Sequence, residues 1–196
     1  MPADAPDGAT FPRMPDHLSR GERVDRMLSL AAGVAAITAV AVSLYQAALA
    51  REQLRASAWP YLAQSNSFSG SQPYLRTVRN DGLGPARVRS FSVLVDGRPV
   101  PNWDAAVRAL TGESEPALVY SSFGRGTVLS PGASRTLLSL PSGPRATTFW
   151  RAAQTRLVTV ACYCSVYDEC WRVDSREDDP RAVRACAEDS ASAFQQ

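Results

Sequence analysis

The four cysteines are the residues whose type and spacing point most directly to chemistry. Cys162, Cys164 and Cys170 fall within one stretch, CYCSVYDECW, and Cys186 follows. Such a group could hold a zinc ion, exchange thiols or form disulfide bonds. Zinc sites usually use pairs of cysteines separated by about two to four residues, whereas this chain has C-x-C-x5-C and its only histidine is the distant His17. A thioredoxin-type redox centre would need C-x-x-C at a helix start, and the sequence has no such motif.

Disulfide bonds are the chemistry that this spacing favours. Alternate residues of a strand share one face, so Cys162 and Cys164 are expected on the same side of a strand. A turn at 167–169 brings Cys170 back beside Cys164, within bridging reach, and leaves Cys186 for Cys162. Four cysteines allow three connectivities, and the sequence alone does not select one. We predict that all four are oxidised, and we expect no metal and no cofactor.

Whether disulfides persist depends on the compartment, which an upstream segment predicts. Met27–Ala50 is a run of 24 residues without a charged side chain. At about 1.5 Å of rise per residue, this length is enough to cross a hydrocarbon core of about 30 Å. The few polar residues do not form one clean face, which argues against a buried amphipathic helix. We therefore expect a transmembrane helix.

A cleavable signal peptide is the alternative for this segment. Ala48-Leu49-Ala50 matches the small-x-small pattern that a signal peptidase reads. However, the apolar run exceeds the usual length of about 7 to 15 residues, and a polar segment of 26 residues precedes it. We expect an uncleaved signal anchor, although the sequence leaves cleavage after Ala50 open.

The arginines on either side of the span predict its orientation. Only Arg51 and Arg55 lie within the first twenty residues after the span, whereas four arginines precede it: Arg13, Arg20, Arg23 and Arg26. Because positive charge near a span is retained in the cytoplasm, the amino terminus is expected inside. The chain is then a single-pass protein of a bacterial inner membrane, with its carboxy-terminal domain in the periplasm.

Composition divides the rest of the chain. The first residues are rich in proline and aspartate, which predicts a disordered tail up to about His17 and a helix that continues inward from the span. After the span, good helix formers predict a short stalk that Pro60 ends. The expected segments are 1–26, a cytoplasmic tail; 27–50, the span; 51–60, the stalk; 61–174, a β domain; and 175–196, a loop or short helix tied back by Cys186.

Short strands separated by turn signals dominate the domain. Runs at 75–80 and 86–96 flank a turn in which Gly82 and Gly84 are expected at positive φ, and Asp96-Gly97 is a strong hairpin signal. Further elements are expected as a helix at 102–112, strands at 117–123, 126–130, 134–140 and 157–167, and one or two helical turns within 147–156. About seven strands of this kind predict a disulfide-stapled antiparallel β-sandwich of the Ig-like type with one or two short helices.

Three motifs after the membrane helix carry a family resemblance. SAWPYL, RNDGLGPARV and CYCSVYDECW occur in this order, and together they resemble a group of uncharacterised bacterial single-span membrane proteins with a small β-sandwich ectodomain. The resemblance covers most of the chain beyond Met27. It implies the architecture, and it implies no activity and no catalytic residue.

The residue types argue against the common catalytic classes. A Ser-His-Asp or Cys-His site needs a histidine base, and His17 is expected across the membrane from the domain. The carboxylates of DSREDDP, 174–180, are typical of a solvated loop with a helix N-cap. All 21 basic residues are arginines spread along the chain, without the basic stripe that nucleic acid requires. We expect no catalytic residue, no enzyme activity and no nucleic-acid partner.

Tethered, non-catalytic recognition or scaffolding at the cell envelope is therefore the expected function. Leu83, Arg125 and Arg176 mark three loops where we expect a protein or envelope component to bind. Small residues spaced along the span, Ala32 with Ala36 and Ala35 with Ala39, are compatible with helix packing in a membrane complex. The chain is also compatible with a homo-oligomer. The alternatives are an accessory subunit of a membrane complex and an enzyme with an unrecognised active site.

Overall fold

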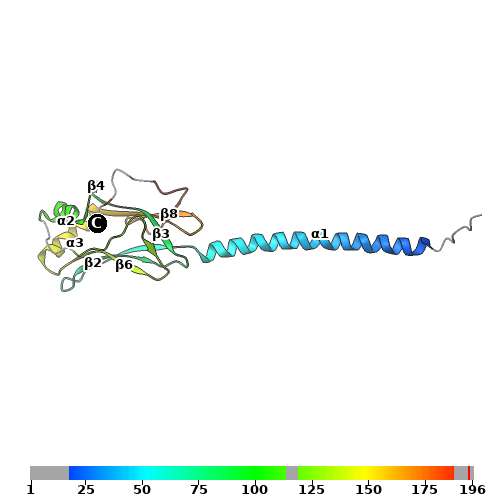
Figure 1. Ribbon diagram of the computed structural model, residues 1–196. Coiled ribbons are helices and arrows are strands. Elements are labelled where there is room, and N and C mark those ends of the chain that lie inside the picture. Colours follow the sequence, from blue (N-terminus) through cyan, green and yellow to red (C-terminus); the bar gives the residue numbers. More distant parts are fainter. Residues whose placement is uncertain (1–17, 114–118, 188–193, 195–196) are drawn as a thin grey trace, which may run out of the picture. The chain divides into compact units, whose positions relative to one another are not determined.

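A computed structural model describes residues 18–113, 119–187 and 194. The chain forms two compact units, Met1–Arg51 and Glu52–Gln196. The first described element is helix α1, Leu18–Ser57, and the strands and the other helices follow in the second unit (Figure 1). The predicted cytoplasmic tail up to His17 lies outside the described residues. Residues 18–26, which belonged to the expected tail segment, already form the first turns of α1.

Helix α1 is long and strongly apolar. Its stretch Gly21–Ser57 is long and apolar enough to cross a membrane, and the apolar window is not buried against the rest of the protein. A helix of this kind near the amino terminus fits a membrane span and also fits a signal sequence. The helix ends at Ser57, shortly before Pro60, because proline disfavours helical conformation in the residue before it.

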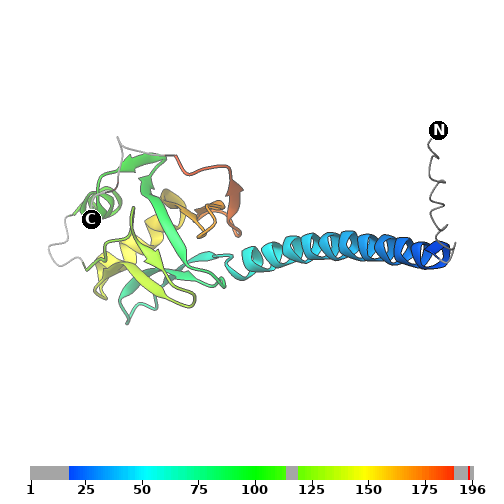
Figure 2. The same ribbon diagram turned by 45° about the vertical axis from the view of Figure 1, so that its right-hand side comes forward.

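The second unit contains two antiparallel sheets, which confirms the predicted β-rich antiparallel domain (Figure 2). The three-stranded sheet has the order β1 (Leu62–Ser67), β2 (Tyr74–Asn80), β6 (Ser134–Leu140). The six-stranded sheet has the order β4 (Arg98–Val100), β3 (Ala86–Val95), β7 (Leu157–Cys164), β8 (Cys170–Asp174), β9 (Arg181–Val183), and β5 (Val128–Leu129) pairs with β3.

The two sheets meet through buried side chains as well as apolar packing. The backbone N–H of Leu62 in β1 donates to the hydroxyl of Tyr163 in β7 at 3.2 Å. Arg76 of β2 is buried and donates to the hydroxyl of Thr159 in β7 at 2.7 Å. Because a buried guanidinium needs partners to offset its lost hydration, these contacts also define how the sheets face each other.

Two helices flank the sheets. α2, Trp103–Thr111, begins after Asn102, whose side chain accepts a hydrogen bond from Ala105, and ends at Gly112 with φ of 81°. The sequence predicted this helix over 102–112 with Gly112 at its end, whereas Asn102 lies just before the helix as its N-cap. α3, Pro144–Arg156, has 13 residues and is longer than the one or two turns expected. Pro144 at the helix start fits the first turn, where its missing N–H costs nothing.

Aromatic rings fill the core beside α2. Phe91 of β3 contacts Trp103, Phe123 and Phe194, with ring centroids 5.2 to 6.4 Å apart. Phe194, near the carboxy terminus, also lies edge-on to Trp103 at 5.2 Å. Aromatic edge-to-face pairs of this kind stabilise a core beyond their area alone. Residue 194 therefore packs back onto the domain.

Three expected elements differ from the structure. The described part of the predicted strand 117–123 makes only an isolated bridge, between Val119 and Ser139, because Phe123 turns into the core. The strand predicted to reach residue 167 ends at Cys164, because the backbone of Ser165 bonds to Glu169 and closes the turn early. β9 forms within 175–196, where a loop or short helix was expected, because its backbone pairs with the open edge of β8.

Candidate functional site

The β7–β8 hairpin carries both disulfides. Cys164 lies directly opposite Cys170 in the register of the two strands, and their sulfurs are 2.09 Å apart. Cys162 pairs with Cys186 at 2.07 Å, which ties the segment after β9 back to β7. The sequence left three connectivities open. The structure has Cys164–Cys170 together with Cys162–Cys186.

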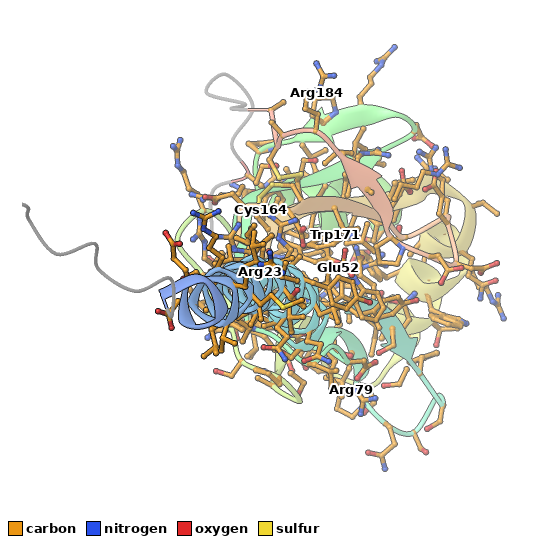
Figure 3. All side chains as sticks on the ribbon, turned by 90° about the vertical axis from the view of Figure 1, so that its right-hand side faces the viewer. Arg23, Glu52, Arg79, Cys164, Trp171 and Arg184 are labelled. Atoms are coloured by element: carbon orange, nitrogen blue, oxygen red, sulfur yellow. A yellow bond between two sulfur atoms is a disulfide. The ribbon has the colours of Figure 1, made fainter. Side chains whose placement is uncertain are left out.

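An arginine-lined pocket of about 400 Å³ opens beside these bridges. Its charged side chains are Arg89, Arg125, Arg184 and Asp168, and its sulfurs belong to Cys164, Cys170 and Cys186. Figure 3 shows the side chains around Cys164 and Arg184. Asp168 already accepts hydrogen bonds from Arg87 at 2.6 Å and from Arg89 at 3.2 Å. Among the described residues that line the pocket, Asp168 is the one carboxylate, and two arginines bond to it.

Asn80 joins the end of the stalk to the domain. Its buried side-chain oxygen accepts from the backbone N–H groups of Tyr61, at 3.1 Å, and Gly82, at 3.0 Å. Its side-chain nitrogen donates to the carbonyls of Gly84, at 2.8 Å, and Leu129, at 3.0 Å. All four hydrogen-bonding positions of the amide are used. The structural role of Asn80 could not be predicted from the sequence, because Asn-Asp-Gly also fits an ordinary surface turn.

Gly82 and Gly84 are required for close approach and not for unusual backbone angles. The sequence analysis expected positive φ at both positions, but neither is among the glycines with positive φ. A Cβ on Gly84 would overlap the backbone of Ala58, and one on Gly82 would lie 2.7 Å from the carbonyl carbon of Pro60. The expectation was wrong because the loop after β2 crosses directly over 58–61 on its way to the second sheet.

Exposed apolar side chains occur on the stalk end, on the loop after β2 and at the tip of the β7–β8 hairpin. Trp59, Leu83, Val166 and Tyr167, which we term the stalk-end surface, are 43%, 70%, 45% and 46% exposed. The N–H of Leu83 donates to the carbonyl of Trp59 at 2.9 Å. The tip of the β7–β8 hairpin is the turn at 165–169, which carries Val166 and Tyr167. An ion pair of 3.9 Å between Arg55 and Glu169 joins that hairpin to the stalk.

The three sequence-predicted binding residues lie on three separate loops. Leu83 belongs to the stalk-end surface, and Arg125 lines the pocket beside the disulfides. Arg176 follows β8 and donates to the buried carboxylate of Asp174 through its Nε at 3.0 Å and Nη2 at 2.8 Å. The structure therefore does not bring them together into one site, and their roles in binding stay predictions.

Asp174 is buried, whereas the sequence predicted that the carboxylates of 174–180 lie in a solvated loop. Besides Arg176, it accepts from Arg172 at 3.0 Å, and its side chain is only 1% exposed. The hydrogen bond from Arg176 holds the pKa of Asp174 below its ordinary value, against the opposing effect of burial. Asp179, in the loop that follows β8, accepts a hydrogen bond of 2.9 Å from the hydroxyl of Tyr61. This bond raises the pKa of that hydroxyl.

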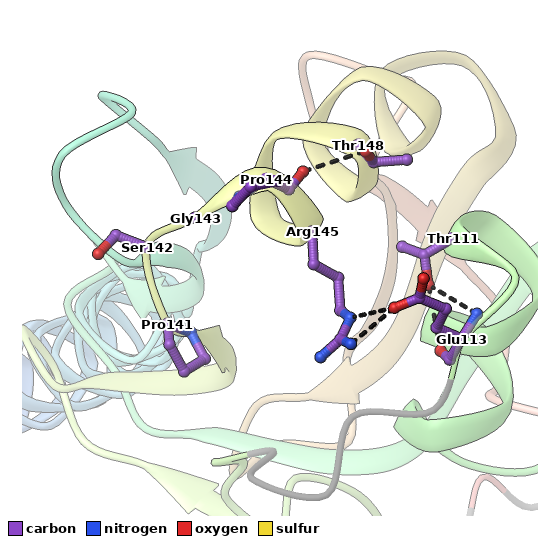
Figure 4. Close-up of a pocket in the computed structure, with 8 residues that line it drawn as sticks. All are labelled: Thr111, Glu113, Pro141, Ser142, Gly143, Pro144, Arg145 and Thr148. Atoms are coloured by element: carbon purple, nitrogen blue, oxygen red, sulfur yellow. Dashed lines mark hydrogen bonds and ion pairs between the residues drawn. The ribbon is translucent and has the colours of Figure 1, made fainter.

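A second pocket, of about 470 Å³, lies between the end of α2 and the start of α3 (Figure 4). Its two charged residues face each other: Arg145 donates to Glu113 through Nε at 3.1 Å and Nη2 at 2.6 Å. Thr111, Thr148 and the segment Pro141–Pro144 complete the lining. Because Arg145 and Glu113 bond to each other, a charged ligand could bind either side chain only after this ion pair opens.

No family model matches the chain, and no curated protein sequence matches it.

Proposed function

We propose that this chain is a single-pass protein of a bacterial inner membrane whose disulfide-bridged domain recognises a protein partner in the periplasm. In this proposal the amino terminus is cytoplasmic, α1 is an uncleaved anchor, and the two sheets pack as an Ig-like β-sandwich. The chain would belong with the bacterial single-span group that its motifs resemble. The function is binding, without turnover of a substrate.

The stalk-end surface is the observation that carries the proposal. Single exposed apolar residues are ordinary on protein surfaces, but a cluster of them marks an interaction site more often. This cluster contains Trp59 and Tyr167, and aromatic residues are enriched in protein interfaces. Arginines at its border, Arg55 and Arg87, supply the polar rim that such interfaces usually have.

The junction beneath this surface is rigidly built. Asn80 fixes the backbone of Tyr61, Gly82 and Gly84 through four hydrogen bonds, and the two glycines allow that backbone to pack without a gap. A surface that is ordered before binding loses less conformational entropy when a partner docks. These hydrogen bonds and close contacts beneath exposed apolar side chains favour a binding surface over a segment that only separates the domain from the membrane.

The length of chain between span and domain limits where the partner can be. Trp59 lies nine positions after Ala50, and this stretch spans at most about 32 Å even when it is fully extended. A partner of the stalk-end surface must therefore be a membrane protein or a protein held close to the bilayer.

Photocrosslinking in intact cells tests this proposal. Probes at Leu83 and Tyr167 are expected to give one shared protein adduct, whereas a probe at Arg98 is expected to give none. Arg98 is a matched control because it is also exposed and lies past the far end of β3, whose ten residues span roughly 30 Å. Equal labelling from all three positions, or adducts with lipid alone, would contradict a protein partner at this surface. An adduct with a subunit of one stable complex would select the accessory-subunit alternative.

A further inference from the structure

The two disulfides lie close enough to exchange with each other. Cys162 and Cys164 are two residues apart on β7, so their side chains share one face. The sulfur of Cys164 lies 3.8 Å from the sulfur of Cys186, to which it is not bonded. This separation is only slightly longer than the roughly 3 to 3.5 Å of a near-attack geometry. A thiolate released at Cys164 would therefore already face the second bridge.

The arginine-lined pocket gives a small molecule access to these sulfurs. Cys164, Cys170 and Cys186 all line it, and Cys186 is the most exposed of the three. Its volume of about 400 Å³ falls within the range of roughly 300 to 1,000 Å³ that small-molecule sites occupy.

The charge of the pocket selects the kind of molecule. Arg89 and Arg184 line it, and Asp168, the one carboxylate among the described lining residues, is held by Arg87 and Arg89. Nearby guanidinium groups favour the thiolate over the thiol, and the thiolate is the reactive form. They also attract carboxylates from solution. A thiol that itself carries carboxylates satisfies both preferences.

We propose that this pocket is a thiol–disulfide exchange site for a small anionic thiol of the glutathione class. The incoming thiolate bonds to the sulfur of Cys170, the Cys164–Cys170 bond breaks, and its electron pair stays on Cys164. The Cys164 thiolate then bonds to Cys186, and the Cys162–Cys186 bond breaks with its electron pair and a proton going to Cys162. A second small thiolate releases Cys170 as a thiol and leaves as the oxidised small-molecule disulfide.

The net reaction is balanced. Two small thiols lose two electrons and become one disulfide, and the protein gains two thiols, at Cys162 and Cys170. The bridge that remains is Cys164–Cys186, which the resting protein does not have. This inference goes beyond the recognition proposed above and does not depend on a partner at the stalk-end surface.

Mapping the first reduction product tests the relay. Full-length protein in detergent micelles is treated with limiting glutathione, quenched with acid and alkylated, and the alkylated cysteines are identified by mass spectrometry. The singly reduced species is expected to carry the label on Cys162 and Cys170. Label on Cys164 with Cys170, or on Cys162 with Cys186, would overturn the relay.

A single substitution gives the same test without a reductant. Cys170→Ser leaves Cys164 without its partner, 3.8 Å from Cys186 in the parent structure. Alkylation of this variant is expected to divide between Cys162 and Cys164, because either of them can then bridge to Cys186. Label on Cys164 alone would overturn the proposal.

Charge selectivity tests the pocket itself. Glutathione and the cationic thiol cysteamine are compared, each normalised to its rate with a small model disulfide. Glutathione is expected to react at least about tenfold faster on this scale, and Arg184→Ala is expected to lower that preference several-fold, whereas Arg98→Ala leaves it unchanged. Equal normalised rates for the two thiols would overturn the assignment of an anionic substrate.

Discussion

Asn80 shows how much of this molecule rests on individual buried polar groups. Its amide bonds to four backbone groups that belong to the stalk end, the crossing loop and the end of β5. Three of the four hydrogen bonds are buried, and a buried polar group left without a partner costs about 1 to 3 kcal/mol. One side chain thus positions the loop that carries Leu83 and the segment that carries Trp59.

Gly84→Ala tests the close approach at the junction. A methyl group there would overlap the backbone of Ala58, so the loop or the stalk end must move. We expect the free energy of unfolding to fall by about 2 to 3 kcal/mol, measured by urea denaturation of the full-length protein in micelles. Gly124→Ala is the matched control, because a Cβ there meets nothing within 4 Å, and it is expected to stay within about 0.5 kcal/mol. Equal behaviour of the two variants would mean that the loop does not pack on the stalk.

Asp174→Asn tests the buried anion. The folded-state pKa of Asp174 lies below its ordinary value because Arg176 hydrogen-bonds to it, so its charge stabilises the fold at neutral pH. This contribution is complete above the unfolded pKa of about 3.9 and is lost as the pH falls through the lower folded pKa. We expect a loss of about 1 to 3 kcal/mol at pH 7 that shrinks below about pH 4.

The control for this experiment is Asp104→Asn, which removes one partner of an exposed ion pair on α2 and is expected to cost under about 0.5 kcal/mol. Unfolding curves for both variants and the parent protein at several pH values give the comparison. A difference between Asp174→Asn and the parent that is independent of pH would contradict a charged Asp174.

Only part of this residue-level chemistry could be predicted from the sequence. The cysteines could, because their spacing fits one hairpin, and so could Asn102 and Gly112, because caps act locally. Asn80, Arg76 and Asp174 could not, because their partners lie on other elements and a buried polar residue looks like a surface residue in sequence.

At the scale of elements, local signals predicted turns and a helix, and they did not give the order of the strands in the sheets. The Asp96-Gly97 turn joins β3 to β4 with φ of 51° and 78°, and α2 has the predicted bounds within a residue. By contrast, β2 and β3 are neighbours in sequence but lie in different sheets. Hydrophobic alternation shows which face of a strand is buried, but it does not show which strand pairs with it. In addition, β9 forms where a loop or short helix was predicted.

The two disulfides should differ in what they contribute to stability. Cys162–Cys186 closes a separation of 24 residues and Cys164–Cys170 one of 6. In the chain-entropy model these loops correspond to about 3.5 and about 2.4 kcal/mol. We expect the Cys162→Ala/Cys186→Ala variant to unfold at lower urea than the Cys164→Ala/Cys170→Ala variant. The reverse order would mean that the Cys164–Cys170 bridge restricts the unfolded chain beyond the hairpin that it closes.

At the scale of the whole molecule, the apolar helix and the β domain have different properties. The helix leaves large apolar side chains such as Ile37, at 72%, exposed, and a lipid bilayer would cover them if α1 spans a membrane. The domain has its own core and two covalent bridges. The length and composition of α1 could be read from the sequence, whereas the stalk-end surface could not, because it is assembled from a loop, a hairpin tip and the stalk.

A carboxy-terminal fusion tests the central claim that α1 anchors the domain outside the cytoplasm. Alkaline phosphatase, which folds only where its disulfides form, is fused after Gln196, and its activity is measured in carbonate-washed membranes and in the soluble periplasmic fraction. The expected result is an active reporter that stays with the washed membranes. An inactive reporter would contradict the orientation and the basis for the disulfides. An active reporter released into the periplasm would show that the helix is a cleaved signal sequence and not an anchor.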